Sequence, residues 1–189
     1  MNDKSTSTGM LSRFAGLMLL SLSIGACSIS MFSEELPPQP CPPVSMLNDA
    51  AKITRFIEGP GRDLIDIDFT AEITNLSGKC FFELDSDTGE GLVRVNVKTQ
   101  FTVERGAGNR DHTASFEYFI SILDDQGKIL DKQTFPYLGK YWKNKQFLKD
   151  PDTPIELTIP LSDGQIGQDF NVYVGFQLSR EELEYNRDN

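Results

Sequence analysis

The sequence predicts an all-β fold built from two packed sheets, and three observations predict it. Apolar and polar residues alternate along most of the chain after residue 44, which is the period of a half-buried strand. Turn residues separate these stretches, and no long stretch has the period of a helix. The chain has 13 Phe and 1 Trp among 189 residues, which suits a packed core. The fold class expected is therefore an antiparallel two-sheet sandwich, immunoglobulin- or fibronectin-like in outline, with about seven to eight strands and a short C-terminal helix.

The individual strands follow from the alternation and the turns between them. The clearest stretches are residues 65–73, 93–103, 116–122, 155–161 and 170–178, and shorter candidates lie at residues 52–57 and 79–84. Residues 124–127, Asp-Asp-Gln-Gly, predict a hairpin turn into a strand at residues 128–135. Ser179 followed by Glu182 predicts a capping box that opens a helix running through Tyr185.

The N-terminus has the organisation of a secretion signal. Lys4 and Arg13 supply positive charge, and residues 14–26 are uncharged and mainly apolar. Such a stretch suits the hydrophobic region of a signal peptide and is too short to span a bilayer comfortably. We expect residues 1–26 to be a lipoprotein signal peptide that is removed on export.

Cys27 is the predicted lipidation site. It follows Ile24, Gly25 and Ala26, an aliphatic residue and two small ones, which is the pattern of a lipobox. We therefore expect a lipid anchor in a bacterial cell envelope, with the domain facing the periplasm. Ser28 after the cysteine favours the outer membrane. The alternative is an ordinary signal peptide cut near Ala26, with Cys27 left free.

Residues 27–43 are predicted to be a tether, and residues 44–189 the sandwich domain. The tether is rich in proline, which favours an extended and semi-rigid spacer. With Cys27 lipidated, Cys41 and Cys80 remain, and an oxidising exported compartment favours a disulfide between them. The alternatives are two buried thiols or, more rarely, a metal or redox pair.

A resemblance to a known group of proteins rests on several short motifs. They are the lipobox, Cys41-Pro42 with Leu47, residues 48–51 (Asn-Asp-Ala-Ala), residues 59–64 (Gly-Pro-Gly-Arg-Asp-Leu) and Cys80. Together they resemble an uncharacterised group of lipoproteins of alphaproteobacteria, over most of the mature chain. The resemblance implies a lipoprotein and no activity, so it contributes no site residue.

Residues 136–149 form the most unusual segment. The segment contains four lysines and no acidic residue, in a chain whose net charge is −10, and aromatic residues are interleaved with the lysines. Basic side chains beside aromatic ones favour an anionic surface such as lipid headgroups or polysaccharide. The alternative is a long connection between strands, with Trp142 covering the core and the lysines in water. The candidate binding residues are Lys140, Tyr141, Trp142, Lys143, Lys145 and Lys149.

Two other segments contain residue types that occur in metal or catalytic sites. Residues 85–90 faintly resemble a calcium loop, but the ligand positions differ, so an acidic turn is favoured. His112 is the single histidine, with Asp111 and Ser115 nearby, but a triad is recognised by geometry and not by adjacency. We predict no catalytic residue, no bound metal and no cofactor.

The leading functional hypothesis is a non-enzymatic envelope lipoprotein. Its sandwich would bind another envelope protein, as an accessory subunit of an envelope assembly, and exposed strand edges offer one means of pairing. The alternative is a binding module for anionic lipid or polysaccharide through residues 136–149. An enzyme is a third hypothesis, disfavoured by the lone histidine. The acidic net charge repels phosphate backbones and excludes general nucleic-acid binding.

Overall fold

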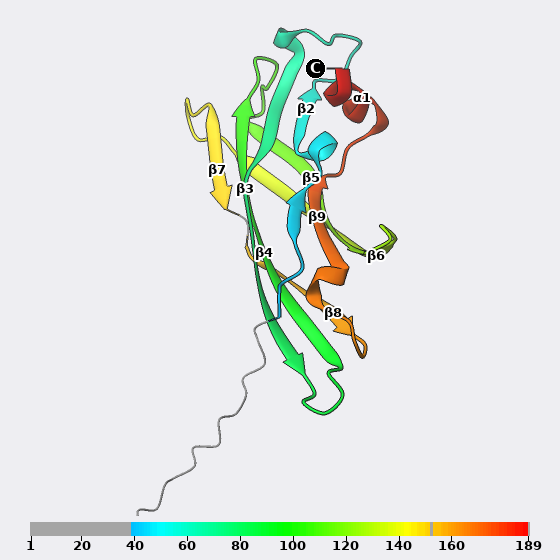
Figure 1. Cartoon of the computed structure of the whole chain (residues 1–189). Coiled ribbons are helices and arrows are strands. Elements are labelled where there is room, and N and C mark those ends of the chain that lie inside the picture. Colours follow the sequence, from blue (N-terminus) through cyan, green and yellow to red (C-terminus); the bar gives the residue numbers. More distant parts are fainter. Residues whose placement is uncertain (1–38, 152, 189) are drawn as a thin grey trace, which may run out of the picture. The chain divides into compact units, whose positions relative to one another are not determined.

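A computed structural model describes residues 39–151 and 153–188. The predicted signal peptide, Cys27 and most of the predicted tether lie outside these residues. The described chain forms two β-sheets packed face to face and one short C-terminal helix (Figure 1). The predicted all-β sandwich is therefore confirmed. In the described part of the chain, no helix is long and apolar enough to cross a membrane.

The first sheet has four strands in the order β1-β9-β5-β6. Their bounds are β1 Val44–Met46, β5 Thr113–Asp124, β6 Ile129–Lys140 and β9 Phe170–Phe176. The short β1 runs parallel to β9, and all other pairs in this sheet are antiparallel. Strand β6 lies at the edge of the sheet.

The second sheet is organised around its long strand β4. Its strands are β2 Lys52–Phe56, β3 Ile67–Leu84, β4 Gly91–Arg105, β7 Phe147–Pro151 and β8 Ile155–Leu161. Strand β3 pairs with the whole length of β4, so β7 and β8 share the opposite side of β4. Strand β7 pairs with residues 100–104 and β8 with residues 91–97. The helical elements are η1 Asn48–Ala50, η2 Leu64–Asp66, η3 Gly167–Asp169 and α1 Arg180–Asp188.

The core lies between the two sheets and follows the predicted alternation. Along β4 the side chains of Val93, Val95, Phe101 and Val103 are at most 1% exposed. The ring of Phe101 lies 5.0 Å from that of Tyr118 and 5.7 Å from that of Tyr137, and both come from the other sheet. Aromatic pairs at these distances add to the free energy gained by burying their apolar area. The core therefore joins the two sheets at the middle of β4.

The structure corrects the predicted strands in two places. Ile65 was expected inside a strand, but it lies in η2 and is 72% exposed. The ladder between β2 and β3 ends at the pair Phe56–Ile67, so earlier residues have no partner strand. The two strands expected at residues 65–73 and 79–84 are the one strand β3, because β4 is long enough to pair with both. The nine strands exceed the seven to eight expected.

The predicted disulfide between Cys41 and Cys80 is confirmed. It joins the chain just before β1 to the C-terminal half of β3. Beyond it, Pro42 is buried, and the carbonyl of Pro43 accepts a hydrogen bond from Val172 at 2.9 Å. The end of the predicted tether, from Cys41 onward, is thus attached to the sandwich.

Replacing both cysteines, as Cys41→Ala with Cys80→Ala, is expected to lower the free energy of unfolding by about 4 kcal/mol. The bridge spans 39 residues, and a loop of that length restricts the unfolded chain by roughly this amount. Urea denaturation of the oxidised protein and the double variant measures the difference. A loss below about 1 kcal/mol would contradict the expectation.

Candidate binding surface

Three connections meet at one end of the sandwich, which we call the loop end. They are residues 57–66, 106–112 and 141–146. Backbone hydrogen bonds tie them together, from Gly106 N to the Asp68 carbonyl, from Arg105 N to the Gln146 carbonyl and from Tyr141 N to the His112 carbonyl, each at 2.8 Å. The loop end therefore has a backbone fixed by the strands it connects.

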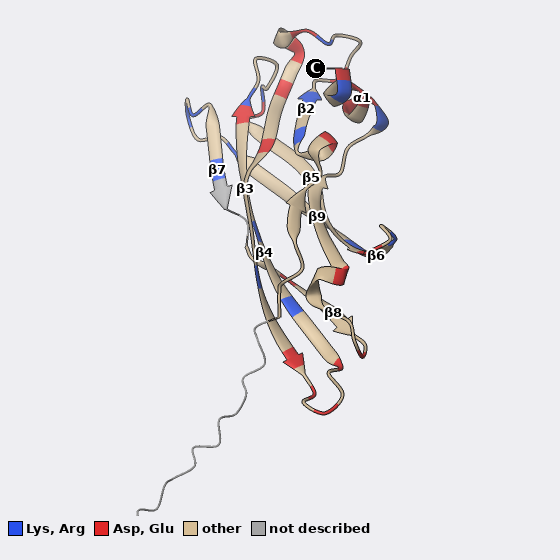
Figure 2. Cartoon of the chain, viewed as in Figure 1, with Lys and Arg blue, Asp and Glu red and all other residues tan. Residues whose placement is uncertain are grey.

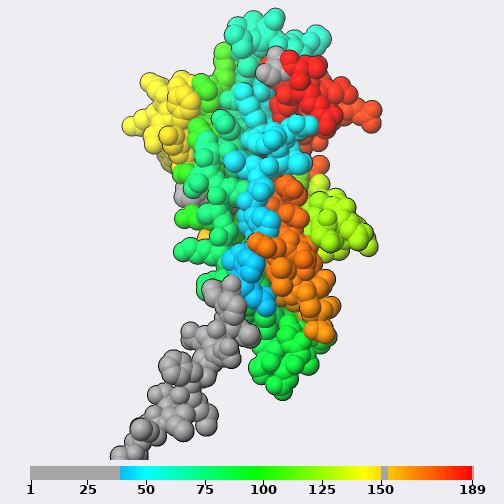
Figure 3. Space-filling view, viewed as in Figure 1, coloured from blue at the N-terminus to red at the C-terminus, as the bar shows by residue number. Residues whose placement is uncertain are grey.

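Residues 138–149 cross from one sheet to the other at the loop end, and we call them the basic ridge. The sequence allowed a long connection here, but residues 138–140 belong to β6 and residues 147–149 to β7, with only a short loop between. Leu138 and Lys140 share the outer side of β6, and Phe147 and Lys149 share the outer side of β7. Figure 2 shows the lysines of the loop and of β7 in blue, and Figure 3 shows the segment in yellow at the side of the domain.

Tyr141, and not Trp142, is the ring that enters the core. Tyr141 is 2% exposed and Trp142 is 70% exposed. Alternation along β6 explains the difference, because Tyr141 lies on the same inner side as the buried Gly139. A turn follows, in which Lys143 has a φ of 54° and Lys145 N donates to the Trp142 carbonyl at 3.1 Å. A positive φ is uncommon for lysine and turns the backbone sharply. The alternative in which Trp142 covers the core is therefore wrong, since Tyr141 does so.

The basic ridge exposes apolar and positively charged side chains together. Leu138 is 77% exposed and Phe147 is 51% exposed, besides Trp142. All four lysines are exposed, and within the described residues none of them forms an ion pair with a carboxylate. The lysines are Lys140, Lys143, Lys145 and Lys149. Their charges are therefore available to a ligand.

A polar cluster lies behind the ridge. Asn109 is 3% exposed, and its amide donates to the Asp68 carboxylate and to the Thr113 carbonyl, each at 2.7 Å. Burial raises the pKa of Asp68, and the hydrogen bond from Asn109 opposes that shift. Burial, followed by the negative charge of Asp68, raises the pKa of Tyr141 to about 12. The buried Tyr141 hydroxyl has no hydrogen-bond partner among the described residues, and its raised pKa keeps it neutral at neutral pH.

The residues considered as a catalytic triad are not brought together as one. His112 Nε2 lies 3.3 Å from an Arg105 guanidinium nitrogen, and the Asp111 carboxylate accepts from the Thr113 hydroxyl at 2.7 Å. The hydrogen bonds from the side chain and the backbone of Thr113 lower the pKa of Asp111. The two side chains hold the loop in shape, and neither is hydrogen-bonded to Ser115 in the described structure.

The segment that faintly resembled a calcium loop is a turn closed on itself. Asp85 accepts from the backbone of Asp87 and of Thr88, both at 3.0 Å. The hydrogen bonds from Thr88 and Asp87 lower the pKa of Asp85. No group of three metal-ligating side chains is found among the residues the structure describes.

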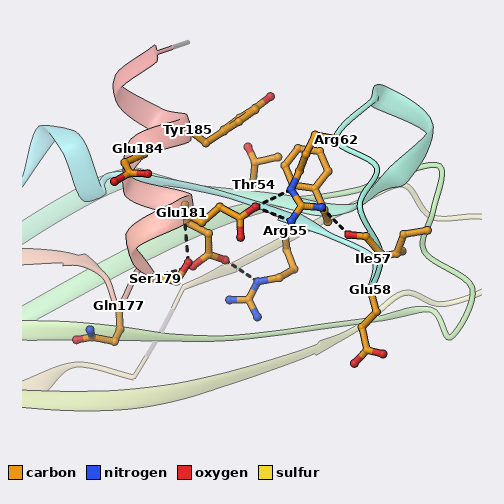
Figure 4. A pocket seen from close by; sticks show the side chains of 13 residues that line it. Thr54, Arg55, Ile57, Glu58, Arg62, Gln177, Ser179, Glu181, Glu184 and Tyr185 are labelled. Carbon is orange, nitrogen blue, oxygen red and sulfur yellow. Dashed lines mark hydrogen bonds and ion pairs between the residues drawn. The ribbon is translucent and has the colours of Figure 1, made fainter.

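A cavity of about 640 Å³ between β2, residues 57–62 and α1 was not predicted from the sequence (Figure 4). Arg55 donates to Glu182 at 2.7 Å, and Arg62 donates to Glu181 at 2.8 Å. The Arg62 guanidinium also lies over the ring of Phe56, 5.2 Å from its centre. These pairs attach α1 to the sandwich. The predicted capping box is present, but no pattern in the sequence indicates where the helix docks.

Beside this cavity, η2 exposes two large apolar side chains, which we call the Leu64–Ile65 knuckle. Leu64 is 80% exposed and Ile65 is 72% exposed. Asp63 and Asp66 fix their backbone, because Asp63 N donates to the Asp66 carboxylate at 3.1 Å. The knuckle is therefore a second exposed apolar feature of the loop end.

Comparison with known proteins gives no match: no family model, no curated protein and no solved structure matches the chain.

Tyr141→Phe is expected to leave the free energy of unfolding unchanged or to raise it by about 1 kcal/mol. The change removes a buried hydroxyl that has no partner and keeps the ring. Tyr141→Ala, the control, should cost about 3–5 kcal/mol because it leaves a cavity. Denaturant unfolding of the three proteins measures both effects. A loss above about 1 kcal/mol for Tyr141→Phe would show that the hydroxyl has a stabilising partner.

Proposed function

We propose that this chain is a lipid-anchored, non-enzymatic binding module of a bacterial cell envelope, and that the basic ridge binds an anionic surface. The observation that carries the proposal is the exposure of Trp142, at 70%, among four lysines that form no ion pair with the residues the structure describes. A folded domain gains no stability from such an arrangement. A negatively charged ligand does gain from it, because it meets positive charge and an amphipathic ring at once.

The expected affinity is modest. Each lysine near an anionic surface contributes about 1 kcal/mol, and the contribution declines within a Debye length of about 8 Å at physiological salt. The chain as a whole is acidic, with a net charge of −10, and repels the same surface at longer range. The ligand must therefore lie directly on the ridge. The anionic oxygens of lipid headgroups and of envelope polysaccharides share this chemistry.

Replacing the four ridge lysines by glutamine is expected to weaken binding at least tenfold at low salt, because about 1 kcal/mol is lost at each position. The probes are dextran sulfate, and phosphatidylglycerol in mixed neutral micelles, added to the full chain in the same neutral detergent. Trp142 is the single tryptophan, so the shift of its fluorescence reports the ridge directly.

The matched control replaces Lys52, Lys79, Lys98 and Lys128 by glutamine. These side chains are also exposed and the change in net charge is the same, but they lie outside the ridge. An equal loss of affinity in both quadruple variants would reject the ridge as the site. It would leave only the net charge as the cause.

A protein partner is the second candidate function, and the Leu64–Ile65 knuckle favours it. Two adjacent apolar side chains, 80% and 72% exposed, lie beside an ion-paired cavity. Apolar anchors surrounded by polar side chains are typical of protein interfaces. The proposal agrees with an accessory subunit of an envelope assembly, in which the knuckle inserts into a pocket of the partner.

A photo-crosslinking residue at position 64, in the full chain in living cells, is expected to capture one defined set of envelope proteins. The same residue at position 158, on the exposed Thr158 of β8, is the control. Mass spectrometry identifies the products. Identical products from both positions would rule out the knuckle as a specific contact.

A further inference from the structure

We infer that the basic ridge binds the same bilayer that carries the lipid of Cys27, so that the domain is attached to one membrane at two points. This inference rests on the proposed function, that the ridge binds an anionic surface. It names the ligand as an anionic bilayer and fixes which side of the domain faces it.

The exposed apolar side chains favour a bilayer over a polysaccharide. Leu138, Trp142 and Phe147 are all more than half exposed. A polysaccharide in water offers negative charge but little apolar volume. The interface of a bilayer offers both, and tryptophan side chains are enriched at that depth. Apolar contact and positive charge together are what bind a peripheral protein to anionic lipid.

The tether is long enough to allow this arrangement. Cys80 pairs with Val95 and Phe147 pairs with Glu104, so the disulfide and the ridge lie about 30 Å apart along β4, at about 3.3 Å a residue. From Cys27 to Cys41 there are about 14 residues, whose extended length is at most about 46 Å. The anchor can therefore stay in the membrane while the ridge rests on its surface.

Tethering also compensates for the modest affinity of the ridge. A surface held close to its ligand by a short linker meets that ligand at an effective concentration in the millimolar range. Binding to the same bilayer is then favoured over binding to a facing membrane, which the ridge meets only by diffusion. Two weak attachments to one membrane reinforce each other in the same way.

The test uses the acylated full chain reconstituted in vesicles and the fluorescence of Trp142. In the first arm, the host vesicles contain phosphatidylcholine, 30% phosphatidylglycerol and brominated phosphatidylcholine as a quencher. In the second arm, the host vesicles are plain phosphatidylcholine, and the anionic and brominated lipids are in separate vesicles added later. We expect Trp142 to be quenched at least twofold in the first arm and to remain unquenched in the second.

The quadruple lysine variant and the matched control separate the ridge from the anchor. Quenching in the first arm should disappear for the ridge variant and persist for the control variant. Quenching that persists in the ridge variant overturns the inference, because the anchor alone would then bring Trp142 to the lipid. Quenching only in the second arm also overturns it, since the ridge would face another membrane.

The remaining outcomes distinguish this inference from the proposed function. No quenching in either arm, with dextran sulfate still bound through the ridge, rejects the bilayer and leaves an anionic polysaccharide as the ligand. No quenching and no binding of dextran sulfate rejects both the inference and the proposed function.

Discussion

The contact of Phe101 with the opposite sheet is the interaction on which the rest of the structure depends. Its side chain is fully buried, and its ring lies within 6 Å of four rings of the other sheet, from Phe116, Tyr118, Tyr137 and Phe176. These rings come from β5, β6 and β9, so one side chain of β4 sets the distance between the sheets. Large aromatic side chains contribute most of the free energy in such cores.

The basic ridge is held from its inner side by that core. The ring of Tyr137 stacks on that of Phe116, with 4.4 Å between the ring centres. Tyr141 follows four residues later, and it is buried on the same side of the chain. Between them, the end of the Leu148 side chain of β7 packs over Gly139, where an added Cβ would lie 2.5 Å from its Cδ1. A side chain at position 139 would therefore displace Leu148. Backbone hydrogen bonds of Tyr141 and Lys145 hold the loop that presents the lysines and Trp142, so binding orders few further main-chain dihedrals.

Reasoning from the sequence predicted the structural features that depend on neighbouring residues. It missed the features that depend on residues far apart in the chain. Alternation located most strands because each is buried on one face, and the expectation of an oxidising, exported compartment indicated the disulfide. Ile65 continues the alternation but has no partner strand, because the ladder between β2 and β3 ends at the pair Phe56–Ile67. Tyr141 and Trp142 are adjacent aromatic residues, and Tyr141 is the one buried because it continues the inner side of β6, where its backbone pairs with His112 of a distant loop. The cavity under α1 joins Arg55 to Glu182, 127 residues apart, so no local pattern indicates it.

The distribution of positive charge separates the parts that hold the domain together from the part proposed to bind. Each ion pair among the described residues uses an arginine, and none uses a lysine. Arginine suits such pairs because its planar guanidinium donates to a carboxylate in two directions. Lysine is a compact, hydrated charge on a flexible chain, which adapts to mobile headgroups. The arginines attach α1 and the strands, while the four ridge lysines have no such role in the fold. Selection for folding alone gives no reason to gather them beside an exposed tryptophan, whereas binding to an anionic membrane does.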